Sequence, residues 1–131
     1  MTDAVPVSRI AQRERMRLDR AAARAVCVAF PAIQRLRIEL EFSGAGTNVP
    51  ARQAHVLHPP ARAFFKFQCP YGDCDGRFDL TDAVDAALSN AERRTMGTLE
   101  CTGLRPRDYL SKQPCALHLR YAVHVVYRQV S

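Results

Sequence analysis

Cys69-Pro70-Tyr71-Gly72-Asp73-Cys74-Asp75-Gly76 is the segment from which the rest of the chain can be interpreted. Its two cysteines have four residues between them, and its proline and glycines are typical of a tight turn. A phenylalanine-rich segment leads into this turn, and a helix start at Leu80-Thr81-Asp82 follows it. Two further cysteines, Cys101 and Cys115, stand at the ends of later segments that read as strands. The expected fold is therefore arranged around these four residues.

Length and composition are those of one ordinary globular domain. The chain has 131 residues, and we assign 1–131 to a single domain with a disordered tail at 1–8. Hydrophobic residues make up 47% and charged residues 24%, so the chain is expected to have an apolar core of its own. The net charge is +6, and 17 of the 19 basic residues are arginine. Arginine suits phosphate recognition, but GC-rich coding sequence also favours it, so the charge favours a nucleic-acid partner only slightly.

The sequence indicates a cytoplasmic protein without a membrane partner. No apolar run approaches the length of a membrane-spanning helix. The apolar segment 21–33 is interrupted by Arg24 and is followed by no clean cleavage site for a signal peptide. Cysteines in the cytoplasm stay reduced, so metal binding or simple burial is expected rather than a disulfide framework.

Hydrophobic periodicity predicts an α+β fold: a mostly antiparallel four-stranded sheet, an N-terminal helix and a short helix inserted after the cysteine turn. The four strands are expected at 36–42, 61–69, 95–101 and 117–127, the last being long enough for a central position. Two connections are expected to be irregular, a long loop at 43–62 and a basic loop at 104–114.

The N-terminal helix is expected over 9–29, and its two halves differ. The first half is mostly charged, whereas Leu18, Ala22 and Val26 place an apolar face on the second half. Docking is therefore expected only through the second half, and Met16 is an alternative start that would make the first half irrelevant. For the short helix after the cysteine turn, Thr81 is the expected N-cap.

The strand directions predict that the four cysteines meet. If the last strand runs antiparallel to its neighbours, Cys69, Cys101 and Cys115 fall at one end of the sheet, and Cys74 folds back onto them. Four thiolates at one point suit tetrahedral Zn²⁺, so the sequence predicts a structural zinc site held by all four. The first pair has the usual ligand spacing, whereas 13 residues separate the second pair.

At Cys-Pro-Tyr-Gly-Asp-Cys (69–74) and Cys-Thr-Gly (101–103) the chain resembles zinc-ribbon-like domains, whose ligands come from turns at the ends of an antiparallel sheet. The resemblance is one of architecture and covers roughly residues 64–127. The inserted helix and the missing second tight pair depart from the zinc-ribbon pattern. Zinc ribbons commonly dock nucleic acids or proteins, so the resemblance implies a binding role rather than catalysis.

Other interpretations of the cysteines stay open. They can remain reduced without a metal, or they can form a disulfide, Cys69 with Cys74 or Cys101 with Cys115. Cys27 lies on the N-terminal helix away from the other four and is expected to be a small buried residue.

Two further sets of residues carry possible metal chemistry. His55 and His58 have a spacing that metals accept, and either can replace one of the later cysteines as a ligand, although exposed loop histidines are more common. Asp73, Asp75 and Asp82 imitate part of an EF-hand loop, but its first position lacks a carboxylate and a strand precedes it. A turn with helix-capping carboxylates is the simpler interpretation of these acids.

These observations favour a small zinc-stabilised binding module with a nucleic acid or a protein as partner. Phosphate contacts are expected at the N-terminal arginines, within 9–24, or at the basic residues of the later connections: Arg93, Arg94, Arg105 and Arg107. The alternatives are an enzyme that uses His55 or His58 of the 43–62 loop, and a structural subunit that docks through its N-terminal helix.

Overall fold

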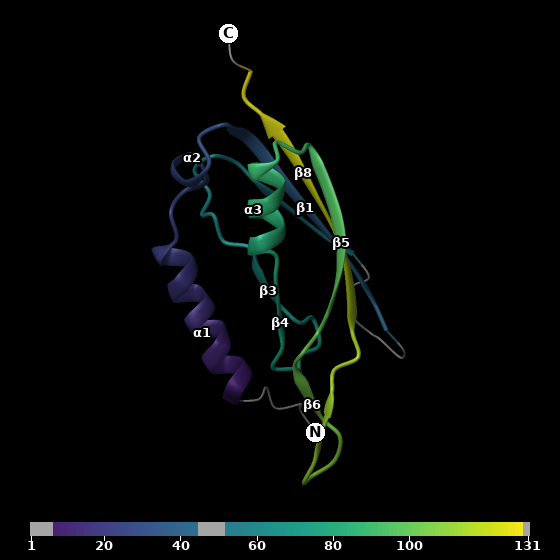
Figure 1. The fold of residues 1–131 in the computed structure, drawn as a ribbon. Helices are drawn as coiled ribbons and strands as arrows, with labels where there is room; N and C mark the ends of the chain where they lie inside the picture. The colour runs from purple at the N-terminus through teal and green to yellow at the C-terminus, as the bar shows by residue number, and fades with distance from the viewer. Residues whose placement is uncertain (1–6, 45–51, 130–131) are drawn as a thin grey trace.

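The computed structural model describes residues 7–44 and 52–129 and confirms the predicted α+β class (Figure 1). The helices in these ranges are α1 (Val7–Ala22), α2 (Val26–Ala29) and α3 (Thr81–Ser89). The strands are β1 (Ile33–Ser43), β2 (Arg52–Leu57), β3 (Lys66–Gln68), β4 (Arg77–Asp79), β5 (Arg94–Glu100), β6 (Leu104–Pro106), β7 (Lys112–Pro114) and β8 (His118–Tyr127). Most of the expected tail at 1–8 lies outside the described residues, and its last two residues already belong to α1.

The main sheet has four antiparallel strands in the order β2-β1-β8-β5. Strand β8, the last in sequence, lies between β1 and β5, as its length predicted. In the register Ile38 faces Val123 and Leu40 faces Tyr121, so the alternating apolar residues of both strands share one face. The predicted strands at 36–42, 95–101 and 117–127 are therefore confirmed.

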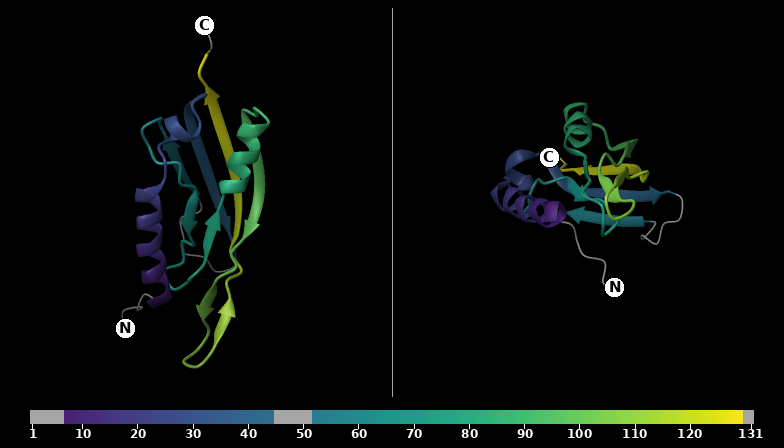
Figure 2. Two further views of the ribbon diagram at one scale, coloured as in Figure 1. Left: turned by 60° about the vertical axis from the view of Figure 1, so that its left-hand side comes forward. Right: turned by 90° about the horizontal axis from the view of Figure 1, so that it is seen from below.

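The apolar face of this sheet is covered, and the core lies beneath the cover. Helix α3 and the small β3–β4 hairpin lie over this face, and α1 lies outside the hairpin (Figure 1, Figure 2). Val84 of α3 is fully buried, and the rings of Phe42 and Phe78 join β1 to β4 at a centroid distance of 5.7 Å. The core therefore continues from the main sheet into the hairpin that precedes α3.

The prediction of a sheet strand at 61–69 is wrong. Only β3 forms there, and it pairs with β4 in a separate two-stranded sheet. The fourth place in the main sheet belongs to β2, which lies inside the predicted 43–62 loop; residues 45–51 of that loop lie outside the described part. As an edge strand β2 alternates between exposed and half-buried residues, so its sequence carries little apolar signal.

The prediction of one helix over 9–29 is also wrong. The chain leaves the helix after α1, Ala25 forms a β-bridge with Arg62, and α2 then makes a single turn. The docking face differs too, because Leu18 is 54% exposed whereas Arg9 and Met16 are buried. Helix α1 therefore docks through its first half as well, since polar contacts of Arg9 replace the apolar contacts that were expected.

Two local predictions need correction. The basic loop at 104–114 is a hairpin of β6 and β7, and its tip is fixed by hydrogen bonds from the amides of Leu110 and Ser111 to the Asp108 carboxylate. The N-cap of α3 is Leu80 rather than Thr81, which is the first residue of the helix, and the Asp79 carboxylate accepts from both the amide and the hydroxyl of Thr81.

Over the ranges 7–44 and 52–129, the protein contains no helix with the length and apolar character needed to cross a bilayer.

Candidate metal centre

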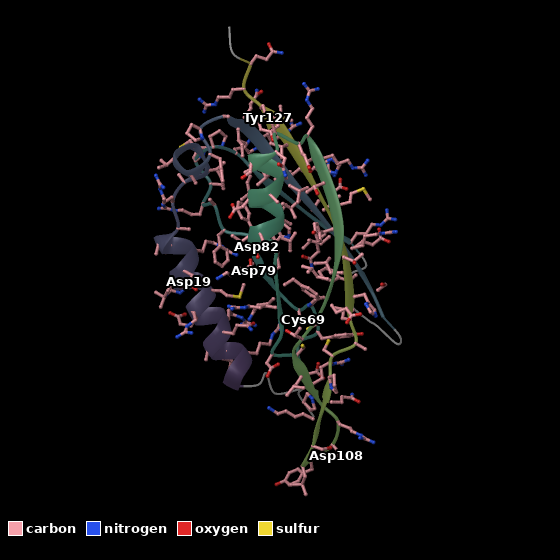
Figure 3. All side chains as sticks on the ribbon, viewed as in Figure 1. Asp19, Cys69, Asp79, Asp82, Asp108 and Tyr127 are labelled. Carbon is pink, nitrogen blue, oxygen red and sulfur yellow. The ribbon has the colours of Figure 1, made fainter. Side chains whose placement is uncertain are left out.

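The structure brings Cys69, Cys74, Cys101 and Cys115 together at the end of the sheet from which the β6–β7 hairpin projects. All four are buried, and their Sγ atoms all lie within 4.8 Å of one another. Each comes from a different position around a strand: after β3, before β4, after β5 and before β8. Figure 3 labels Cys69 near this end of the fold and Asp108 at the distal tip of the hairpin.

The sulfur spacing fits a single tetrahedral metal ion. The Sγ atoms of Cys69 and Cys115 are 3.8 Å apart, and those of Cys74 and Cys101 are 3.5 Å apart. With metal–sulfur distances of about 2.3 Å, tetrahedral ligands stand about 3.8 Å from one another. The alternative disulfides do not form, because these four cysteines and Cys27 are all free thiols. The four cysteines are therefore close enough to hold one metal ion.

Two turns of the same form, Cys74-Asp75-Gly76 and Cys101-Thr102-Gly103, each hold one of the four cysteines. In Cys74-Asp75-Gly76 the glycine amide donates to the Cys74 Sγ at 3.2 Å, and in Cys101-Thr102-Gly103 the glycine amide donates to the Cys101 Sγ at 3.4 Å. Such N–H donors stabilise negative charge on sulfur and orient it. The Cys-x-Gly pattern, which occurs at both turns, is the sequence signal for this geometry, and the spacing of the cysteines alone does not reveal it.

The other two cysteines, Cys69 and Cys115, are each bonded through the backbone to the glycine of one turn. The amide of Cys69 donates to the Gly76 carbonyl at 3.0 Å, and the amide of Cys115 donates to the Gly103 carbonyl at 2.9 Å. Cys101 and Cys115 are therefore joined by the same backbone arrangement as Cys69 and Cys74, although they lie further apart in the sequence. The 13 residues between its cysteines are accounted for by the β6–β7 hairpin, which is inserted into the turn.

The two turns pack backbone against backbone through their glycines. A Cβ atom on Gly103 would lie 2.3 Å from the Gly76 nitrogen, and one on Gly76 would lie 2.3 Å from the Cys101 Sγ. Distances this short exclude any side chain unless the backbone moves. Both glycines are thus required for the close approach that gathers the sulfur atoms.

Hydrogen bonds among the clustered thiols move their pKa values apart. Hydrogen bonds from Cys69 and then Cys74 lower the pKa of Cys101 to about 4. The hydrogen bond with Cys101 in turn raises the pKa of Cys69 far above its usual range and raises that of Cys74. These hydrogen bonds therefore favour one thiolate stabilised by neighbouring thiols, and a cation bound to all four sulfurs would displace the remaining protons.

A buried arginine fixes the first turn from outside. Arg9 of α1 is 8% exposed, and its Nη1 donates to the carbonyls of Cys69, Tyr71 and Cys74 at 2.8–2.9 Å. Beside it the Gln12 side-chain amide donates to the Asp75 carbonyl at 2.7 Å. Sequence reasoning missed Arg9 because nothing distinguishes a buried arginine from its exposed neighbours in a charged helix.

The acids of the turn are used in separate contacts. Asp73 forms an ion pair with Arg105 at 2.8 Å, and Asp75 accepts from the amide of Leu104 at 2.7 Å. The guanidinium of Arg105 also lies 3.7 Å from the ring centroid of Tyr71. These contacts join the first turn to β6, in agreement with a structured turn rather than an EF-hand loop.

The predicted basic residues of the later connections do not form one cluster. Arg93 and Arg94 stand at the start of β5, whereas Arg105 and Arg107 follow its end, so the two pairs lie at opposite ends of that strand. Arg105 is already held by Asp73.

The histidines of the 43–62 segment are also apart from the cysteines. His55 lies on β2 with its ring 4.8 Å from the Phe67 ring, and its Nε2 contacts the Gln53 side chain. His58 follows β2 and is exposed. Within the described ranges, the group close enough to share a metal ion contains cysteines alone. Cys27 is half-buried on α2.

A scan against protein-family models found no match, and searches of curated proteins and of solved structures found none either. The resemblance to zinc ribbons therefore rests on the cysteine geometry of this chain alone.

Proposed function

We propose that this chain is a small binding module stabilised by one structural Zn²⁺ ion held by Cys69, Cys74, Cys101 and Cys115. The observation that carries the proposal is the burial of four thiols within 4.8 Å of one another, with backbone amides directed at two of the sulfurs. Thiolates select soft or borderline cations, and a closed set of four is typical of structural zinc.

A non-catalytic role follows from the donor set. Four thiolates complete a tetrahedral shell and leave no position for a substrate or a reactive water. Zn²⁺ with four thiolates carries two net negative charges, and Arg9 and Arg105 supply positive charge next to the first turn. When bound, the ion supplies a cross-link between the two Cys-x-Gly turns, and the backbone amides stabilise the charge on sulfur.

The metal connects the parts of the molecule that the main sheet does not. Cys69 and Cys74 belong to the turn that α1 contacts, whereas Cys101 and Cys115 flank the β6–β7 hairpin. A metal at this point fixes α1 and the hairpin relative to the sheet. Fixed surfaces at both sides of a small core are what a docking module requires.

Metal analysis tests the proposal. Protein purified without chelator should contain about one equivalent of zinc, and Cys74→Ser should lose it together with more than about 4 kcal/mol of stability. Cys27→Ser is the matched control, since Cys27 lies outside the cluster, and it should keep both.

Two results would contradict the proposal. Less than about half an equivalent of zinc in the wild-type protein would refute the metal assignment. One equivalent of iron in its place would keep the site but refute zinc as its metal.

A further inference from the structure

We infer that the groove between α1 and strands β2 and β3 binds single-stranded nucleic acid, with arginines of α1 holding phosphates and an aromatic floor holding bases. This inference rests on the proposed binding role and names the partner. The groove has a volume of about 390 Å³, and its cationic lining residues are Arg13, Arg17, Arg20 and Lys66. Among the described residues that line it, none is acidic.

The spacing of the arginines places them along one side of α1. Arg13, Arg17 and Arg20 stand at positions i, i+4 and i+7, which bring side chains to the same face of a helix. They span about 10 Å of helix axis, enough to follow more than one phosphate of a strand. Lys66 of β3 lines the same groove. The cations therefore form a track rather than a single anion site.

The two acids of α1 do not neutralise the positive charge of these four residues. Glu14 pairs with Arg17 in an exposed ion pair, which contributes little and is readily exchanged for a phosphate. Asp19, labelled in Figure 3, is the other acid of α1 and does not line the groove. Burial and then the charge of Arg20 lower the pKa of His55, which packs on Phe67 of the groove lining, in agreement with a positive local potential.

Aromatic rings lie next to the cations. Phe67 lines the groove, and the His55 ring packs on it at 4.8 Å, so the two rings form a half-buried platform on β2 and β3. The Arg20 guanidinium lies 5.0 Å above the Phe64 ring. A positively charged groove with aromatic rings is the combination by which proteins bind single strands without strong sequence preference. A duplex hides its bases and cannot use such a platform.

The open face of the main sheet is a weaker candidate. Unlike the groove beside α1, this wider hollow is itself lined by acids. Glu39 and Glu41 stand among its arginines and pair with Arg37, Arg52 and Arg120. Its charge is therefore largely compensated within the sheet.

Fluorescence anisotropy with a labelled 12-nucleotide oligo(dT) tests the inference, and oligo(U) shows whether RNA binds as well. Four phosphate contacts predict that the logarithm of the binding constant falls with the logarithm of salt concentration at a slope of about −2.8. The double variant Arg13→Gln/Arg17→Gln should bind more weakly, with a slope nearer about −1.4. Arg35→Gln/Arg128→Gln removes the same charge from exposed arginines on β1 and after β8 and should leave the affinity within about twofold.

A base-free oligomer with the same number of phosphates separates base stacking from charge. It should bind at least about fivefold more weakly than oligo(dT). Equal binding of the two oligomers, or equal binding by the two double variants, would overturn the inference. Tighter binding to phosphatidylserine vesicles than to oligo(dT) would also overturn it, in favour of a lipid surface.

Zinc content and melting temperature, measured on every variant, keep this inference separate from the proposed function. Wild-type protein that holds zinc, stays folded and fails to bind oligo(dT) refutes the nucleic-acid site alone.

Discussion

At the scale of single residues, the candidate metal centre depends on glycine as much as on cysteine. Gly76 and Gly103 let two chain segments approach until their backbones touch, and each also directs an amide at a neighbouring sulfur. Neither glycine can be replaced without moving the backbone, because the space for a Cβ atom is occupied by the facing turn.

Gly103→Ala should therefore behave like the loss of a ligand. Its added methyl group would lie within 2.4 Å of Gly76 backbone atoms, so the turns must separate, at a cost of roughly 2 kcal/mol or more. Zinc binding should weaken in parallel, as measured by competition with a chromogenic chelator. Gly72→Ala is the matched control, because nothing lies within 4 Å of the added atom. Equal stability of the two variants would contradict the packing described.

His55 should titrate below its usual range in the folded protein. Burial and then the Arg20 charge lower its pKa by disfavouring the protonated ring. The folded state then binds this proton more weakly than the unfolded chain does, so its contribution lowers stability as pH falls below about 6.5. Above that pH both states are neutral and the contribution vanishes.

Ring proton signals measured by NMR check this. The His55 signal, assigned by its absence in His55→Gln, should have a midpoint below about 6.5 in the folded protein and near it in urea. Oligonucleotide bound in the groove should raise the folded midpoint, since phosphates offset Arg20. A folded midpoint above the urea value would contradict the environment of β2.

At the scale of elements, the docking of α1 is unusual because a polar contact supports its N-terminal half. One guanidinium nitrogen of Arg9 serves three carbonyls of the turn that carries Cys69 and Cys74. Those carbonyls converge because the turn is tight, and buried carbonyls without partners are costly. Arg9 thus links helix packing to the shape of the metal turn.

Arg9→Met should show whether the hydrogen bonds of Arg9, and not only the volume of its side chain, stabilise the protein. The substitution keeps an unbranched chain of similar length but removes every donor, and it should cost about 2–4 kcal/mol in urea unfolding. The exposed Arg15→Met should stay within about 0.5 kcal/mol. If Arg9→Met were as stable as Arg15→Met, α1 would have to be held by its apolar contacts alone.

The elements also show what the sequence could and could not predict. Strand β8 and the apolar face of β1 were predictable, because their alternation is regular and one side is fully buried. Strand β2 was not, because an edge strand with Gln53 and His55 on its inner side lacks that contrast. The phenylalanines of 61–69 suggested a sheet strand, yet that segment supplies core residues mainly from irregular backbone.

The convergence of the four cysteines was predicted from the sequence, whereas the residues and the hairpin around them were not. Four cysteines in a chain expected to be reduced favour a metal site, and the expected strand directions brought all four to one end of the sheet. The β6–β7 hairpin was missed because its strands have three residues each and both include proline. Arg9 was missed because burial of an arginine depends on tertiary contacts that leave no local pattern.

For the whole molecule, the proposed metal would act mainly on parts that the main sheet does not hold. The sheet carries its own apolar core with α3, whereas α1 and the β6–β7 hairpin are joined to it largely around the cysteines. The protein should therefore survive metal removal as a weakened fold rather than unfold completely, unlike a minimal zinc finger.

Removal of zinc with a strong chelator should lower the melting temperature by about 10 °C or more. Hydrogen exchange should show where the loss occurs: amides of α1 and of the β6–β7 hairpin should lose protection before those of β1 and β8. Zinc restored in excess should recover protection. Equal loss in all four elements would show that the metal supports the sheet itself.

The central position of β8 has a consequence for how the protein is made. Synthesis at about 5–20 residues per second separates the completion of β1 from that of β8 by roughly 4 to 17 seconds. Throughout that interval the edge of β1 that later pairs with β8 has no partner, whereas its other edge can pair with β2 once that strand has been made. The nascent chain thus passes through a window in which an unpaired strand edge is open to chaperones and to aggregation.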